Sequence, residues 1–294
     1  MDEPLSKSQQ RLRGRKLVEM TDDELLEWID ACEKMERGVS AAKARRSWKQ
    51  SGQNAHEELK RRRMNETEWL ACCDPGPMLE FLGDKVSDRK RRLFACACCR
   101  RIQHFFSDER SLKAVEVAEL YADGLKDRVH LIGARDEARD VKRQFRANYA
   151  ERQFLEPADA VVLRAAGAAQ DVTRDTGMSA AINCYCETSR AMNMEDTNDC
   201  NPAELRQQAL LVQCIFGNPF KPAFLDPSWL RCNDDTVVKL ARGIYDEQAF
   251  DRLHILANAL EATGCSDTEI LDHCRIPGPH FRGCWVIDLL LGKN

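Results

Sequence analysis

The last forty residues contain the cysteine and histidine side chains whose spacing could bind a metal ion. Cys265, Cys274, His280 and Cys284 are separated by eight, five and three residues. Structural zinc sites use four tetrahedral ligands of this kind, and short spacers let one compact segment supply them. These spacers are those of CCCH zinc fingers, with the last two ligand types exchanged. The segment therefore predicts a structural zinc site formed by these four residues.

Helix signals in the same segment support a second interpretation. Ser266 followed by Glu269 is the pattern of a capping box, which predicts a helix from this point. A regular helix would hold the sulfurs of Cys265 and Cys274 far apart. Cysteine is also a small apolar side chain that is often buried. In this alternative the cysteines belong to the core, His280 is a hydrogen-bonded core histidine, and the chain needs no cofactor.

A third interpretation is a cysteine nucleophile. Cys284 follows Arg282 by two residues and His280 by four, with His273 nearby in sequence. A cationic neighbour or a helix N-terminus favours the thiolate, and a histidine could act as its base. Packing along a terminal helix explains the same spacing equally well. Cys284 and His280 are therefore candidates for catalysis that no other sequence motif supports. The chain contains no phosphate-binding loop, dinucleotide motif, HExxH or GxSxG.

A row of basic side chains is the main candidate for contact with nucleic acid. It lies on one predicted helix after Ser87 and consists of Arg89, Lys90, Arg91, Arg92, Arg100 and Arg101. Such rows bind phosphates, but they more often form a solvated helix face. The same alternatives apply to the basic run 60–63. The net charge of −4 gives the whole chain no attraction to nucleic acid or an anionic membrane.

Composition favours a folded protein of the cytoplasm. Hydrophobic residues make up 43% of the chain and charged residues 31%, as is ordinary for a globular protein. The N-terminus lacks the apolar region of a secretory signal, and no apolar run is long enough to span a membrane. We therefore expect a cytoplasmic protein whose fourteen cysteines stay reduced and mostly fill the core.

Helical periodicity dominates the chain. The sustained alternation of apolar and polar residues that is typical of β-strands is absent, so the sequence predicts an all-α protein built from helical hairpins. Thr21 and Glu24 form a capping box, and Ser87 and Pro157 mark further helix starts. We expect disorder over 1–20 and an irregular connection or a frayed helix over 174–202. The proline-rich segment 216–230 should cross the surface in extended form and place its aromatic side chains on the core.

These signals divide the chain into four parts. Residues 1–63 form a helical appendage, 64–125 a helical hairpin unit, 126–203 a variable helical connection, and 204–294 a C-terminal helical unit.

Two blocks of the sequence resemble a set of uncharacterised proteins from planctomycete-type bacteria. The first block contains EWLACCDPGPMLEFL, RRLFACACCRRI and AVEVAELYADG, and the second runs from IFGNPFKP to HFRGCWVIDLLLGK. Together they cover about half of the chain and exclude the first 63 residues. The resemblance implies a bacterial protein and transfers no catalytic residue, because the family has no assigned activity.

The leading functional expectation is a non-catalytic scaffold that binds a protein partner. One alternative is a zinc-stabilised Cys/His module that binds nucleic acid, and another is a cysteine-dependent enzyme.

Overall fold

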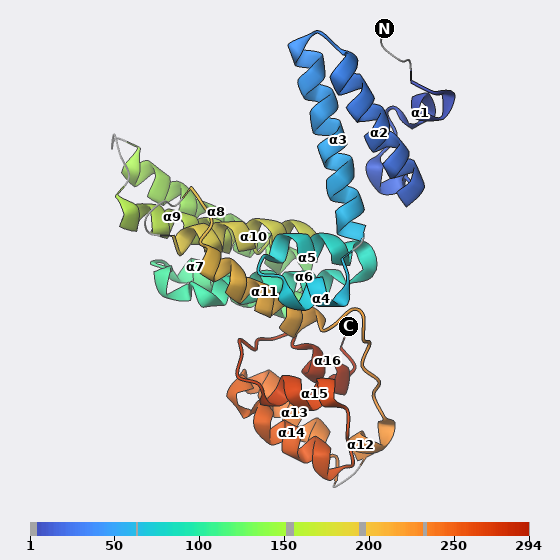
Figure 1. Cartoon of the computed structure of the whole chain (residues 1–294). Helices are drawn as coiled ribbons and strands as arrows, with labels where there is room; N and C mark the ends of the chain where they lie inside the picture. The colour runs from blue at the N-terminus through green and yellow to red at the C-terminus, as the bar shows by residue number, and fades with distance from the viewer. Residues whose placement is uncertain (1–4, 63, 151–155, 194–197, 232–233, 294) are drawn as a thin grey trace. The chain divides into compact units, whose positions relative to one another are not determined.

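The computed structural model describes residues 5–62, 64–150, 156–193, 198–231 and 234–293, without the side chains of residues 60–62. The basic run 60–63 thus lies outside the described side chains. Sixteen α-helices and four short 3-10 helices form the regular structure of the described residues, which contain no strand (Figure 1). The predicted all-α class is confirmed. The chain divides into two compact units, 1–65 and 66–294, each described by itself. The expected boundaries near residues 125 and 203 stay predictions.

The first unit is a helical hairpin with a short helix packed on it. Its elements are α1 (Lys7–Leu12), α2 (Asp22–Gly38) and α3 (Ala42–Arg62). Thr21 and Glu24 form the predicted capping box at the start of α2. The expectation of disorder over 1–20 was wrong for the described part, because α1 has its own capping box and buries Leu12. No α-helix in the described chain is long and apolar enough to cross a membrane.

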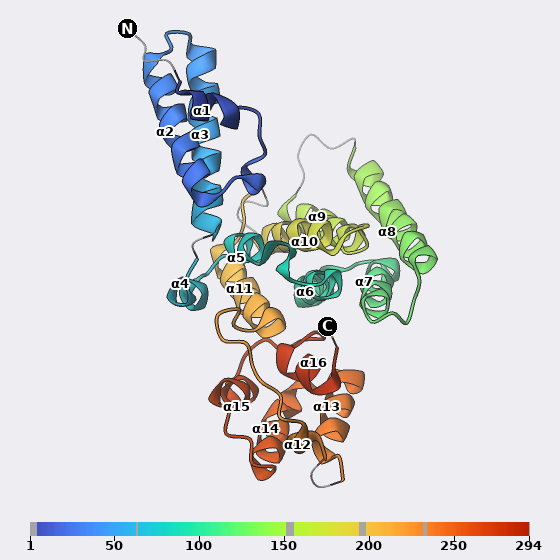
Figure 2. The same ribbon diagram turned by 90° about the vertical axis from the view of Figure 1, so that its right-hand side faces the viewer.

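Five helices of the second unit form a closed array. They are α6 (Asp88–Arg101), α7 (Glu109–Ala122), α8 (Arg128–Tyr149), α9 (Pro157–Asp171) and α10 (Gly177–Ala191). Each packs on the next, and α10 returns to pack on α6 (Figure 2). Ser87 caps α6 and Pro157 opens α9, as predicted. Small alanine, cysteine and valine side chains dominate the shared core.

The segment 174–202, expected to be an irregular connection or a frayed helix, contains the regular helix α10. Its sequence lacks a stripe of large apolar residues, but Ala180, Ala181 and Cys184 are fully buried. At its start, an added Cβ on Gly177 would lie 2.3 Å from the carbonyl oxygen of Asp88. The small residues of α10 therefore serve close packing against α6.

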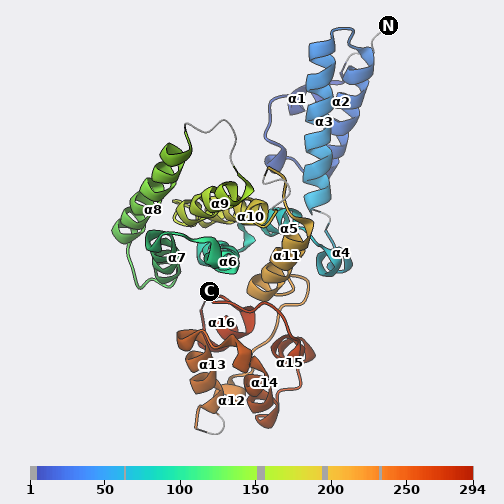
Figure 3. The same cartoon turned by 90° about the vertical axis from the view of Figure 1, so that its left-hand side faces the viewer.

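The described part of the second unit contains eight further α-helices, and five of them surround a separate apolar core. The eight are α4 (Glu66–Ala71), α5 (Pro75–Leu82), α11 (Pro202–Phe216), α12 (Pro227–Arg231), α13 (Thr236–Glu247), α14 (Leu253–Ala262), α15 (Thr268–Arg275) and α16 (Trp285–Leu291). Helices α12 to α16 gather around this core, and α11 leads into them from the five-helix array (Figure 3).

The proline-rich segment is irregular between α11 and α12, as predicted, but from Pro227 onward it forms the helix α12 rather than continuing in extended form. Phe220 stacks on Phe81 with ring centroids 5.2 Å apart, and Trp229 is buried. Phe224 does not join the core, because 75% of it is exposed. One cap also differs from the prediction, since Asp267 rather than Ser266 accepts the hydrogen bond at the start of α15.

Candidate metal centre

Four side chains of the second unit form a cluster that could hold a metal ion. Cys214, His273, His280 and Cys284 each offer one ligand atom, and these atoms all lie within 4.8 Å of one another. Both cysteines are buried, and both histidines are half-buried. The candidate centre is therefore a Cys2His2 set whose two cysteines belong to the C-terminal apolar core.

Three helices and one loop position the four ligands. Cys214 lies in the last turn of α11, and His273 lies in the last turn of α15. Pro277 and Pro279 keep the chain after α15 non-helical, and His280 follows them in this loop. Cys284 occupies the position just before α16. The segment 273–284 thus supplies three ligands, while the fourth, Cys214, comes from a helix that is distant in the sequence.

Two of the separations between ligand atoms are close to those of tetrahedral zinc coordination. His273 Nε2 lies 3.2 Å from Cys284 Sγ, and His280 Nδ1 lies 3.4 Å from Cys214 Sγ. Typical zinc–sulfur and zinc–nitrogen bonds at the tetrahedral angle place such atoms about 3.6 Å apart. The ring centroids of the two histidines lie 4.9 Å apart, nearly edge to face. Small shifts of the side chains would therefore bring all four atoms to one ion.

The protonation of the two cysteines also suits a metal ligand set. Burial opposes ionisation of Cys284, but the hydrogen bond from Cys214 and the nearby His273 and His280 outweigh it, so the pKa of Cys284 falls well below its ordinary value. The hydrogen bond to Cys284, together with burial, raises the pKa of Cys214 well above its ordinary value. A metal ion binds the deprotonated thiolates.

Two of the four ligands predicted from sequence belong to this cluster, and two do not. His280 and Cys284 are members, whereas Cys265 and Cys274 are buried in the apolar core formed by α12 to α16. Burial raises the pKa of both of these thiols. The structure therefore brings His280 and Cys284 of the predicted ligand set into the cluster and places Cys265 and Cys274 in the apolar core.

A lysine from the five-helix array contacts the backbone beside both cysteine ligands. Lys90 Nζ donates to the carbonyl oxygen of Ile215, which follows Cys214, and to that of Gly283, which precedes Cys284, each at 2.9 Å. Gly283 has a φ of +95°, and an added Cβ there would lie 3.0 Å from the side chain of Leu93. Lys90 thus holds together the two backbone segments that carry Cys214 and Cys284.

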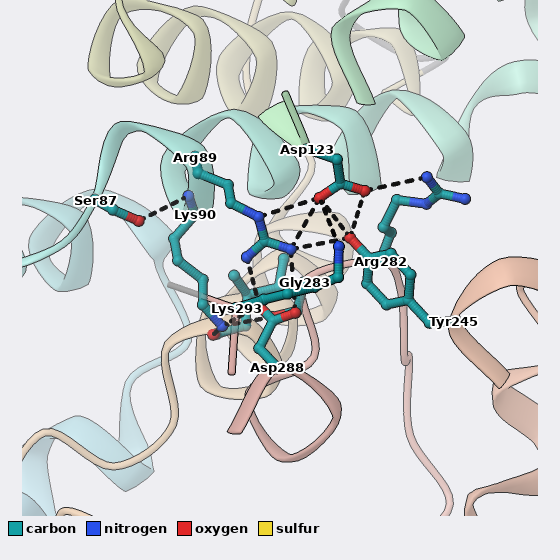
Figure 4. A network of polar contacts seen from close by, with 10 residues as sticks. Ser87, Arg89, Lys90, Asp123, Tyr245, Arg282, Gly283, Asp288 and Lys293 are labelled. Atoms are coloured by element: carbon teal, nitrogen blue, oxygen red, sulfur yellow. Dashed lines mark hydrogen bonds and ion pairs between the residues drawn. The ribbon is translucent and has the colours of Figure 1, made fainter. Parts of the chain in front are cut away.

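The same lysine belongs to a buried network of charges. Arg89 bonds Asp123 and Asp288 with separations of 3.0 and 2.7 Å, and Lys90 lies 2.7 Å from Asp288 (Figure 4). The hydroxyl of Tyr245 donates to Asp123 at 2.6 Å. Both carboxylates are almost completely buried, at 1% and 2% side-chain exposure. The network joins α6, the end of α7, α13 and α16.

The basic row predicted for nucleic acid is engaged inside the protein. The buried Arg92 donates to the carbonyl oxygens of Val172 and Arg174 at the end of α9. Arg91 donates to the carbonyl oxygen of Gly83. The other two form bidentate pairs, Arg100 with Glu119 and Arg101 with Glu204. Arg89, Lys90, Arg91, Arg92, Arg100 and Arg101 are therefore neither an open phosphate-binding row nor a solvated face.

Two hollows flank the metal centre, and each reaches one histidine. The first has a volume of about 370 Å³ and is lined by His273, Trp69, Trp285 and Lys221 among others. The second, of about 420 Å³, is lined by His280 and Cys274. Cys284 lines neither hollow and is 0% exposed. The histidine edges are thus the sides of the centre that face solvent.

Comparison with known proteins found no match among family models, curated proteins or solved structures. The resemblance to planctomycete-type proteins therefore stays a prediction.

Proposed function

We propose that this chain is a zinc-binding, non-catalytic protein in which a Cys2His2 centre fastens the C-terminal helices to α11. The convergence of four ligand atoms from separate elements within 4.8 Å carries the proposal. Thiolates and imidazoles together favour zinc over oxygen-seeking cations. Four protein ligands complete the tetrahedral shell, which is typical of structural rather than catalytic zinc.

The burial of Cys284 supports a structural role over a cysteine nucleophile. The side chain has no exposed surface, and its sulfur contacts the other members of the cluster. A nucleophile needs access to its substrate, so a catalytic pair of Cys284 and His280 receives little support. Because the ligand thiols must stay reduced to bind metal, we propose a reducing compartment such as the cytoplasm.

An apolar surface beside the centre favours a role in binding a protein partner. Leu70 and Ile276 line the hollow at His273 and are 57% and 62% exposed. Phe224 follows Ala223, which lines the hollow, and is 75% exposed. Exposed apolar groups gathered around a hollow are typical of protein interaction sites. Zinc would then stabilise the surface on which the partner docks.

Removal of the metal tests the structural role. At free zinc 100-fold above the dissociation constant, binding adds about 2.7 kcal/mol to the free energy of unfolding. For a unit of this size we expect the melting temperature to fall by about 5–10 °C after chelation and to recover when zinc returns. The matched control is the Cys214→Ser/Cys284→Ser variant, whose melting temperature should not respond to either treatment. A wild-type protein that melts at one temperature with and without chelator would refute the structural role.

A further inference from the structure

The helix α8 presents four basic side chains on one face. Arg139, Lys142, Arg143 and Arg146 occupy positions i, i+3, i+4 and i+7, which lie on one side of a helix. Together with Gln170 of α9 they line a hollow of about 340 Å³, and no acidic residue of the described part of the chain lines it. We propose that this α8 basic hollow binds the phosphate groups of a nucleic-acid strand.

The charges of the hollow are available to a ligand. Arg139 and Arg143 each pair with the aspartate three residues earlier, Asp136 and Asp140, at 2.9 and 3.1 Å. Both pairs are exposed, and such pairs contribute little and exchange readily with other anions. Lys142 and Arg146 take part in no ion pair among the described residues. Lys142 lies near the buried Asp171 and the carboxylate of Glu187, so the charge available to a ligand comes from the three exposed arginines, Arg139, Arg143 and Arg146.

The dimensions match a phosphodiester backbone. From Arg139 to Arg146 the helix rises about 10 Å. Over that length one strand of B-form DNA carries about three phosphates. The amide of Gln170 adds a neutral hydrogen-bond donor at the same place. The row is thus long enough to neutralise several successive phosphates rather than one.

The helix is held in place by its opposite face. Leu131, Ala134, Ala138 and Val141 are buried against the neighbouring helices, and α8 packs on α7 and α9. In Figures 2 and 3 it lies at the outer edge of the five-helix array. The basic face is therefore both rigid and accessible to a long ligand.

The lining favours nucleic acid over a membrane surface. Peripheral helices that bind anionic lipids also insert apolar side chains into the bilayer, and among the residues that the structure describes no apolar side chain lines the hollow. The residues of the metal centre do not line it either, so this inference is independent of the proposed zinc role.

Fluorescence anisotropy with a labelled single-stranded oligonucleotide and its duplex tests the inference on the full-length protein. We expect binding whose affinity falls with salt. The variant Arg139→Gln/Arg143→Gln/Arg146→Gln should weaken it about tenfold or more at 0.1 M salt. Loss of three phosphate contacts should also reduce the slope of log K against log salt by about 2 to 3.

The matched control is Arg206→Gln/Arg242→Gln/Arg252→Gln, which removes the same charge from exposed positions outside α8 and should leave binding unchanged. Circular dichroism melting of both variants checks that the fold is kept. Equal losses in the two variants, absence of binding to either oligonucleotide, or binding only to inorganic polyphosphate or to vesicles containing phosphatidylserine would each overturn the inference.

Discussion

Lys90 is the residue that ties the metal centre to the five-helix array. Its ammonium group contacts the backbone next to both cysteine ligands and the buried carboxylate of Asp288. The positive charge of Lys90 beside the two cysteines also lowers the free-energy cost of placing two thiolates in a buried site. Lys90 itself is no ligand, so its role is to position Cys214 and Cys284.

Replacement of Lys90 by methionine should weaken zinc binding without abolishing it. Groups that orient metal ligands typically change metal affinity by about 10–100-fold, and we expect a loss in that range. Lys90→Arg should recover part of the affinity. The visible spectrum of the cobalt-substituted protein should keep its tetrahedral form in both variants. Competition with a chelating dye measures the affinity.

The control is Lys239→Met, which removes a lysine that is 63% exposed and paired with Asp234. It should bind zinc as the wild type does. If Lys90→Met also kept wild-type affinity, the lysine would have no positioning role.

At this same scale the sequence predicted only the local half of the site. His280 and Cys284 are close in sequence, so their spacing alone suggested shared coordination. Cys214 lies on another helix about 70 residues away, and no local pattern connects it to them. His273 and Cys274 are neighbours on α15, and a rotation of about 100° between successive residues decides which of them faces the centre. Only the packing of α15 settles that choice.

The element that depends most on small side chains is the contact between α10 and α6. An added methyl at Gly177 would lie 2.3 Å from a backbone oxygen, which cannot move without shifting the first turn of α6. We expect Gly177→Ala to lower the free energy of unfolding by about 1–3 kcal/mol, measured by urea denaturation.

Gly133→Ala is the matched control for that substitution. Gly133 also lies inside a helix, but nothing comes within 4 Å of an added Cβ. Alanine loses less conformational entropy than glycine on folding, so this variant should be more stable by about 0.5–1 kcal/mol. Equal effects of the two substitutions would be inconsistent with close packing at Gly177.

Helix boundaries were predictable where a cap or a proline marks them, as at Thr21, Ser87 and Pro157. The helix α10 was not predicted as a regular helix because its buried residues are small (alanine, glycine, cysteine, serine and threonine) and leave no strong apolar period. The basic row on α6 was misread for a different reason. Its carboxylate partners Glu119, Asp123, Glu204 and Asp288 come from later segments, and pairing across such distances has no local signature.

For the second unit as a whole, a metal ion bound at the proposed centre would cross-link distant parts of the chain. A bond between Cys214 and Cys284 through one ion would close a loop of about 70 residues, which contains most of the C-terminal core. Closing a loop of this length restricts the unfolded chain and so stabilises the folded one. The buried network around Arg89 joins α16 to α6, the end of α7 and α13 without a metal. Zinc would therefore add to a fold that already has internal contacts.

The central claim is the identity of the four ligands, and metal content measures it directly. Elemental analysis of protein purified under reducing conditions without chelator should find about one equivalent of zinc per chain. The variant Cys214→Ser/Cys284→Ser should lose it, whereas Cys265→Ser/Cys274→Ser should retain it. No metal in the wild type, or loss of zinc only in the Cys265/Cys274 variant, would contradict the assignment of Cys214, His273, His280 and Cys284.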